Sequence, residues 1–359
     1  MVLTEKRKNR IRHIVSAILI FLVVPLCERG KDMSGANAVN AFAGEELICA
    51  IELGDDMYSS YGLETGFNYE LLGRFAKDNR CSLKVVASNR NTNYLDSLKA
   101  GKVDIVIIPK NDSLDLKGLE LTRKVDDRSV WALQKADRQK VRQVNSWISH
   151  ITSSKEFSKM RNSYRGTFNP HKLAERGITR STLSPYDKII RKHAATLGWD
   201  WRMLAAVVYQ ESKFSINSVS HRGASGLMQI MPQTGKYYGA DDLLNPDQNI
   251  EAGVKHLKRL QNLWKGTDMD VMELVKFTLA AYNAGEGRIA DCRNFAAAKG
   301  FDNSKWEEIV KVIPLMREDS ILEEESVKLG KFQGYETIEY IDNVMSHYNA
   351  ICQICPTSF

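Results

Sequence analysis

The chain has 359 residues, of which 43% are hydrophobic and 26% are charged, and its formal net charge is +6. The many apolar residues exclude a disordered chain, six cysteines are too few for a disulfide scaffold of this length, and a mean hydropathy of −0.33 excludes a protein with many membrane spans. At roughly 100–200 residues per domain, the length predicts two domains or three.

The positive charge is concentrated near the N-terminus. Residues 1–26 hold five basic residues and one acidic residue, whereas residues 181–359 hold 20 basic and 23 acidic residues. Basic runs and aromatic-interleaved arginines are absent from the second half. Since a nucleic-acid partner requires clustered positive charge, we expect no nucleic acid among the ligands.

The first 26 residues resemble an export signal. Lys6, Arg7, Lys8, Arg10 and Arg12 precede an uncharged run at 14–26, which is long enough for a secretory signal and too short for a spanning helix. We therefore expect an exported, periplasmic protein.

The end of the signal is left open by the sequence. Cys27 stands where a bacterial lipoprotein carries its lipid, which favours tethering to the outer membrane, although Pro25 and Leu26 fit that motif poorly. A cut after Ala43 would instead release a soluble protein, and an uncleaved anchor is the third alternative.

The remaining cysteines give no indication of a metal site. The pair Cys352 and Cys355 has no second Cys or His pair beside it, so we expect no zinc. We interpret the five residues as apolar fillers or a tail disulfide: Cys49, Cys81, Cys292, Cys352 and Cys355.

A first domain is predicted at 46–168, after a Gly-, Ala-, Asn- and Ser-containing tether at 27–45. Apolar runs and helical spacing alternate along it, which is typical of a parallel α/β sheet. The expected strands are 47–51, 83–87 and 103–108, with a further one at 129–134, and the expected helices are 67–79, 93–100 and 140–164.

This domain resembles the extracellular solute-binding family that captures amino acids. The matching segments are GFNYELLGRFAKDN, DSLKAGKVDIVII and WALQKADRQKVRQVNSWISHI. A complete member has two lobes that close over the ligand, but residues 108–129 leave no room for a second lobe. We therefore expect a single periplasmic-binding-like α/β lobe, which acts as a spacer or docks a partner, with a small ligand as the alternative.

A linker is predicted at 169–183, followed by a mainly α domain at 184–353. Ser184 and Pro185 have the pattern of a helix start, Gly198 that of a helix end, and Asp200 that of the next N-cap. The second helix is expected to reach Ser212, and a loop or small hairpin at 223–231 interrupts the array. Further helices are expected at 249–264, 270–284, 304–313 and 335–349.

Glu211 continues the apolar face of the second helix, which includes Leu204 and Val207 or Val208. Partial burial and the negative end of the helix dipole both disfavour an ionised carboxylate there, so both raise its pKa. A carboxylic acid of raised pKa can protonate the leaving oxygen of a glycosidic bond. The alternative is an ordinary surface glutamate paired with Lys213.

The segments around and after Glu211 resemble the soluble lytic transglycosylase family, which has a goose-type lysozyme-like fold. They are ESKFSINSVSHRGASGLMQIMPQT, AYNAG at 281–285 and GYETIEYIDNVMSHYN. A solute-binding-like domain ahead of this one resembles the order in the membrane-bound lytic transglycosylase F group.

By position, the resemblance implies that Glu211 is the single catalytic acid/base. It also implies that Ser220 and Gln229 bind the substrate's N-acetyl group, that Met231 lines the same subsite, and that Tyr282 and Asn283 face Glu211, with Tyr282 orienting it. Glu336 would lie at the sugar groove, with Tyr340 as a buried aromatic beside it. Each of these residues also has an ordinary structural account, as core, backbone partner or solvated acid.

The family's chemistry implies peptidoglycan glycan strands as substrate. Glu211 would protonate the oxygen between N-acetylmuramic acid and N-acetylglucosamine and then take the proton of the muramyl C6 hydroxyl, which forms a 1,6-anhydro ring. No second carboxylate, metal or cofactor is needed, and Asp241 and Asp242 are interpreted as solvated loop acids. A lysozyme-type hydrolase and a non-catalytic wall or solute sensor remain as alternatives.

Overall fold

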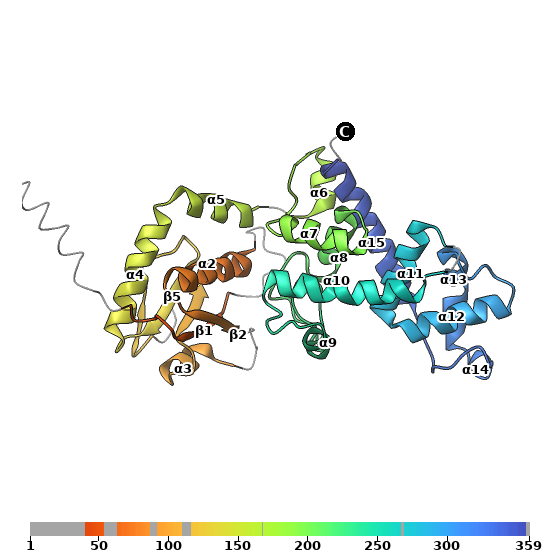
Figure 1. Ribbon diagram of the computed structural model, residues 1–359, viewed down its shortest axis with the longest axis horizontal. Coiled ribbons are helices and arrows are strands. Elements are labelled where there is room, and N and C mark those ends of the chain that lie inside the picture. Colours follow the sequence, from red (N-terminus) through yellow and green to blue (C-terminus); the bar gives the residue numbers. More distant parts are fainter. Residues whose placement is uncertain are drawn as a thin grey trace, which may run out of the picture. The chain divides into compact units, whose positions relative to one another are not determined.

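The computed structural model describes residues 40–53, 63–86, 92–109, 116–166, 168–266 and 269–356. The chain divides into two units, Met1–Ala43 and Gly44–Phe359, and the second is described below (Figure 1). The predicted export signal, the lipidation at Cys27 and most of the tether lie outside the described residues. Within the described part of the chain, no helix has the length and apolar character needed to cross a membrane.

A five-stranded mixed sheet forms the first half of this unit. The strands are β1 (Glu46–Ile51), β2 (Ser82–Val86), β3 (Ile105–Pro109), β4 (Leu119–Leu121) and β5 (Ser129–Gln134), in the order β2-β1-β3-β5-β4. The first three are parallel, as predicted, whereas β5 runs antiparallel to β3 and to β4. The antiparallel pairing of β4 with β5 follows from their short connection, which has no helical crossover, as a parallel pair would need.

Helices pack on both faces of the sheet (Figure 1). On one face, α3 (Tyr94–Lys99) contributes Leu95 and Leu98 to a buried cluster with strand residues such as Val106. The side chain of Asn93 caps its first turn by accepting from the amides of Leu95 and Asp96.

The other face is covered by α2 (Glu64–Asp78) and α4 (Arg138–Thr152). The ring of Phe75 on α2 meets Trp131 of β5 edge-on at 5.7 Å and Trp147 of α4 at 5.1 Å. The single helix predicted at 140–164 is in fact two, because Ser154 accepts from the amide of Phe157 and starts α5 (Lys155–Tyr164). A serine N-cap inside an amphipathic run was the missed signal.

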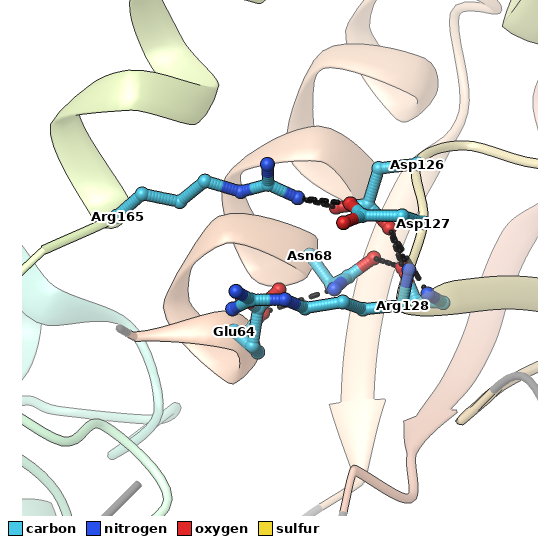
Figure 2. A network of polar contacts seen from close by, with 7 residues as sticks. Glu64, Asn68, Asp126, Asp127, Arg128 and Arg165 are labelled. Atoms are coloured by element: carbon cyan, nitrogen blue, oxygen red, sulfur yellow. Dashed lines mark hydrogen bonds and ion pairs between the residues drawn. The ribbon is translucent and has the colours of Figure 1, made fainter. Parts of the chain in front are cut away.

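A network of charged side chains joins α2, the start of β5 and the end of α5 (Figure 2). Arg128 pairs with Glu64, and Arg165 pairs with Asp127 and, at 3.2 Å, with Asp126. The carboxyl of Asp126 also accepts from the backbone amide of Ser129 at 3.0 Å. The described guanidinium and carboxyl groups of this network are thus engaged with one another.

The second half of the unit is helical. Its elements are α6 (Pro170–Glu175), α7 (Asp187–Leu197), α8 (Trp201–Ser212), α9 (Pro232–Tyr237), α10 (Pro246–Leu263), α11 (Val271–Ala284), α12 (Glu286–Ala298), α13 (Trp306–Val312), the 3-10 helix η2 (Ile313–Arg317), α14 (Asp319–Leu322) and α15 (Tyr335–Ile354). The helices α8 and α15 pack against each other, as do α10 and α11 (Figure 1). The described fold is therefore mainly helical with a small mixed sheet.

Most helix ends follow the predicted signals. Gly198 ends α7 in a left-handed conformation with φ of +74°, and Asp200 caps α8 by accepting from the amide of Arg202. The start predicted at Ser184 and Pro185 is wrong by two residues: α7 begins at Asp187, whose carboxyl accepts from the amides of Leu183 and Ser184. The helices α6, α9 and α12 lie in segments where the pattern predicted none.

The five described cysteines are free. Cys49, Cys292 and Cys355 are buried, as expected of apolar fillers. Burial raises the pKa of the Cys292 thiol to about 12 and that of Cys355 to about 11, which keeps both thiols protonated near neutral pH.

Candidate active site

Glu211 lies in the last turn of α8. The preceding turns of this helix bury Leu204, Val207 and Val208 completely, and Glu211 itself is half-buried beside them. The predicted apolar face of α8 therefore ends in a carboxyl group that is only partly exposed to water.

Among the described residues, one hydrogen bond orients this carboxyl. The hydroxyl of Tyr340, a buried residue of α15, donates to Glu211 Oε1 at 2.6 Å. Burial raises the pKa of Glu211 to about 7, although the hydrogen bond from Tyr340 and the charge of Lys213 oppose this rise. The group is consequently part protonated at neutral pH, which suits a general acid that must later act as a base.

Tyr282, on α11, lies near Glu211 but bonds elsewhere. Its hydroxyl donates to the backbone carbonyl of Met228 at 2.7 Å. Burial and then the neighbouring Glu211 carboxylate raise its pKa well above the usual range. The resemblance implied that Tyr282 orients the acid, whereas the described hydrogen bond comes from Tyr340, and Tyr282 holds the turn that follows α8.

The segment 223–231 forms a tight turn, as the glycine-rich pattern predicted. Isolated bridges pair Ser225 with Val219 and with Ile230. The side-chain nitrogen of Gln229 donates to the carbonyls of Ser218 and Gly226 at 2.9 and 3.0 Å, so this amide satisfies backbone groups of the turn.

Ser220 lies exposed at the start of the same turn. Its hydroxyl accepts from the amide of Ala224 at 3.0 Å, and its own amide donates to the carbonyl of Ala224 at 2.9 Å. The hydroxyl hydrogen is not used by this contact and remains available to an acceptor on a ligand.

Asn249 holds this turn in place through side-chain hydrogen bonds, and the sequence analysis did not predict this role. The side chain is completely buried on α10; it donates to the carbonyls of Ser225 and Leu243 at 2.9 and 3.0 Å and accepts from the amide of Met228 at 2.8 Å. The available signal was a polar residue on a buried helical face, which requires hydrogen-bond partners.

Strained backbone conformations gather around Glu211. Among the described non-glycine residues, four have positive φ, and three of them are Lys213, Phe214 and Gln229. Lys213 ends α8 and places its ammonium over the ring of Tyr209 at 4.3 Å. Such conformations cost about 1–3 kcal/mol each and are concentrated at functional sites.

The other predicted substrate residues are accessible. Met231 is 43% exposed at the N-cap of α9, and Asn283 and Glu336 are exposed at the end of α11 and the start of α15. Thr337 donates to Asn283 Oδ1 at 2.9 Å, which joins these two helix ends. Their contact with substrate remains a prediction.

A chain of hydrogen bonds fixes α15 to α8 next to the acid. His347 Nε2 lies 3.0 Å from Gln210 Oε1, and His347 Nδ1 lies 2.7 Å from His171 Nε2 on α6. Since the amide oxygen only accepts, Nε2 of His347 carries the proton and Nδ1 accepts from His171. Burial, Lys213 and His171 lower the pKa of His347 to about 3, so this ring stays neutral.

The structure thus brings Glu211, Tyr282 and Tyr340 together and places the turn 223–231 against them through Met228. Asp242 accepts from the amide of Leu244 at 2.9 Å and from the hydroxyl of Tyr69 on α2 at 2.6 Å, so the prediction of a solvated loop acid is wrong for this half-buried carboxyl. Groups of three or more His, Cys, Asp or Glu residues that could hold a metal ion do not occur in the part of the chain described.

The candidate active site thus combines a carboxylic acid at a helix end, a glycine-containing turn and two tyrosines, Tyr282 and Tyr340. Residues 188–305 match the family model of the transglycosylase SLT domain. This match covers α7 to α12, including Glu211, the turn 223–231 and Tyr282.

The curated relatives named membrane-bound lytic murein transglycosylase F extend the similarity beyond that domain. The protein of Desulfosudis oleivorans is 32% identical over 230 residues, which are 62% of this chain and 50% of that protein. Those of Shewanella loihica and Vibrio campbellii are 34% and 27% identical over 43% and 64% of this chain and 32% and 41% of their own lengths. The chain thus spans about half the length, or less, of these relatives.

Among solved structures, an inactive mutant of lytic transglycosylase Slt from Pseudomonas aeruginosa is 25% identical, with a TM-score of 0.34, over 47% of this chain and 24% of that one.

Proposed function

We propose that the protein is a peptidoglycan lytic transglycosylase. The observation that carries the proposal is the half-buried Glu211, with a pKa of about 7 and a hydrogen bond from Tyr340, inside a segment that matches the transglycosylase SLT domain. The names of the relatives, which call them lytic murein transglycosylases, support the same activity.

In the proposed reaction Glu211 acts twice. Its protonated carboxyl gives the proton to the glycosidic oxygen between N-acetylmuramic acid and N-acetylglucosamine, and the bond from that oxygen to the muramyl C1 breaks. The carboxylate then takes the proton of the muramyl C6 hydroxyl, whose oxygen bonds to C1 and closes the 1,6-anhydro ring. The proton returns to Glu211, so no water is consumed and one acid suffices.

A conventional glycosidase needs a second carboxylate at a fixed distance from the first. Here the substrate hydroxyl would replace that nucleophile. The groups that act on the pKa of Glu211 are Tyr340 and Lys213, and Glu211 in turn acts on Tyr282. These phenols and this lysine agree with a single-acid mechanism.

The remaining predicted residues would bind the glycan strand. Ser220 and Gln229 would face the N-acetyl group, Met231 would line the same subsite, and Asn283 and Glu336 would contact the strand farther along. Tyr340 would hold the acid in place, and Tyr282 would hold the turn that carries Gln229.

The first domain would be one lobe of a solute-binding fold at 46–168, joined through 169–183 to a lysozyme-like domain at 184–353. We further propose that the protein is exported, acts in the periplasm in cell-wall turnover, and is tethered to the outer membrane through Cys27. The description of the relatives as membrane-bound supports this location.

The test is a digest of purified sacculi by the purified chain, with the muropeptides analysed by mass spectrometry. We expect products that end in 1,6-anhydromuramic acid, and Glu211→Gln should lower the rate at least about 100-fold. Glu273→Gln, a change of the same kind on α11, is the control.

Reducing-end muramic acid without anhydro products would instead indicate a lysozyme-type hydrolase. Activity that survives Glu211→Gln would exclude the single-acid mechanism. A chain that binds wall fragments and cleaves none would be a sensor and not an enzyme.

A further inference from the structure

A row of rings extends from the candidate active site to the surface. It consists of Tyr282 on α11, His256 on α10, and Tyr238 and Tyr237 at the end of α9, and is called the ring row. Successive ring centroids are 5.4, 5.9 and 4.8 Å apart. Its inner end, Tyr282, lies beside Glu211. Burial is the main cause that raises the pKa of Tyr282, and the Glu211 carboxylate raises it further.

The outer end of the ring row is open to solvent. Tyr237 is 78% exposed, whereas Tyr238, His256 and Tyr282 are half-buried. Met231, 43% exposed, stands at the other end of the same short helix α9. One exposed apolar side chain needs no explanation, but Tyr237 is joined by successive ring contacts to Tyr282 beside the acid.

The polar groups along the ring row indicate what kind of ligand fits. The charged groups that act on His256 are Arg259 and Glu286, which pair with each other at 2.9 Å. Burial and then Arg259 lower the pKa of His256, so this ring is neutral near pH 7. The described surroundings of His256 and Tyr238 therefore present rings and neutral or mutually paired polar groups, which suit an uncharged, hydroxyl-rich ligand better than a charged peptide.

We propose that the ring row is a sugar-binding subsite for the glycan strand beyond the cleavage point, with the exposed ring of Tyr237 stacked on the apolar face of a pyranose ring. Polar edges of His256 and Arg259 would bond to its hydroxyls. This inference rests on the proposed function, because a strand held at Glu211 is what reaches Tyr237. Long strands would gain affinity from it, and short fragments would not.

The experiment measures binding by isothermal titration to the full chain carrying Glu211→Gln, so that the strand is not cleaved. The ligands are peptide-free peptidoglycan strands of eight or more sugars and the single disaccharide. Tyr237→Ala is compared with Tyr237→Phe, which keeps the ring, and with Leu263→Ala, which removes an exposed apolar side chain of α10 outside the ring row.

We expect Tyr237→Ala to weaken binding of the long strand about 3- to 10-fold and to leave the disaccharide unchanged, as for the loss of one ring contact. Tyr237→Phe and Leu263→Ala should bind as the parent does. Unchanged binding of the long strand by Tyr237→Ala would overturn the inference, as would a Tyr237 effect that appears only when the strand carries stem peptides.

The proposed function can fail separately. If the chain with Glu211 intact releases no anhydro products, while the Tyr237 dependence of strand binding persists, the enzyme assignment is wrong and the sugar subsite stands.

Discussion

The carboxyl group of Glu211 is subject to two opposing influences. Burial favours its neutral form, whereas the hydroxyl of Tyr340, donating at 2.6 Å, and the charge of Lys213 favour its ionised form. The balance leaves the pKa at about 7. An acid whose pKa is near the working pH exchanges its proton readily in both directions, which a single acid/base requires.

Replacing Tyr340 with phenylalanine tests this balance. A hydrogen bond to a charged group contributes about 1.5–3 kcal/mol and one pKa unit is about 1.4 kcal/mol. Its loss should therefore raise the pKa of Glu211. In the wild type, kcat/KM should fall as the pH rises through about 7, because the acid form is lost. In Tyr340→Phe this fall should move to higher pH by about one unit.

The control is Tyr348→Phe, on the same helix, which removes a phenol that donates to Asp200 at 3.3 Å. It should leave the pH profile where it is. If Tyr340→Phe lowers the rate without moving the alkaline limb, Tyr340 holds the helix in place but does not control the acidity of Glu211.

At the scale of elements, packing around the turn 223–231 explains why one of its two glycines is required. Neither Gly223 nor Gly226 has a side chain that would keep a sugar from the backbone. A Cβ on Gly226 would lie 2.4 Å from the carbonyl oxygen of Leu243 and 2.2 Å from the Asn249 side chain, whereas a Cβ on Gly223 would meet nothing within 4 Å. Protein packing therefore requires glycine at 226, whatever binds above it.

The two glycines form a matched pair for mutation, since φ is +86° at Gly223 and +79° at Gly226. Gly223→Ala should cost only the strain of a positive φ, about 1 kcal/mol. Gly226→Ala adds a clash with backbone, so we expect a loss of about 2–4 kcal/mol in the free energy of unfolding, together with most of the activity. Equal losses in urea denaturation would show that backbone strain alone decides both positions.

Local sequence signals predicted much of the fold but few of the residues that hold the candidate active site in place. Periodicity and caps gave α8, α10, α11 and α15 to within a few residues, because each has an apolar face and most have a capping side chain. The break after Thr152 and the start of α7 follow local hydrogen bonds of Ser154 and Asp187 that periodicity alone does not reveal. The direction of β5 depends on its pairing with β3, which is distant in the sequence. The roles of Asn249 and His347 are also tertiary: a buried polar residue reveals its importance only when its partners are known.

At the scale of the whole molecule, the first domain raises the question of whether it binds a free amino acid. Its helices and sheet surround a network in which Arg128 and Arg165 pair with Glu64, Asp126 and Asp127 (Figure 2). A free amino acid needs a cation for its carboxylate and an acceptor for its ammonium. In this network those groups already satisfy one another, and breaking a partly buried pair is costly.

We therefore expect the purified chain not to bind free amino acids. Thermal unfolding in the presence of each common amino acid, up to millimolar concentrations, should show no rise in the midpoint. A ligand at 100 times its Kd would add about 2.7 kcal/mol of stability, which is easily measured. A midpoint that climbs with the logarithm of one amino acid's concentration, and no longer climbs in Arg128→Gln, would show that this network opens to hold a ligand and that the domain senses solutes.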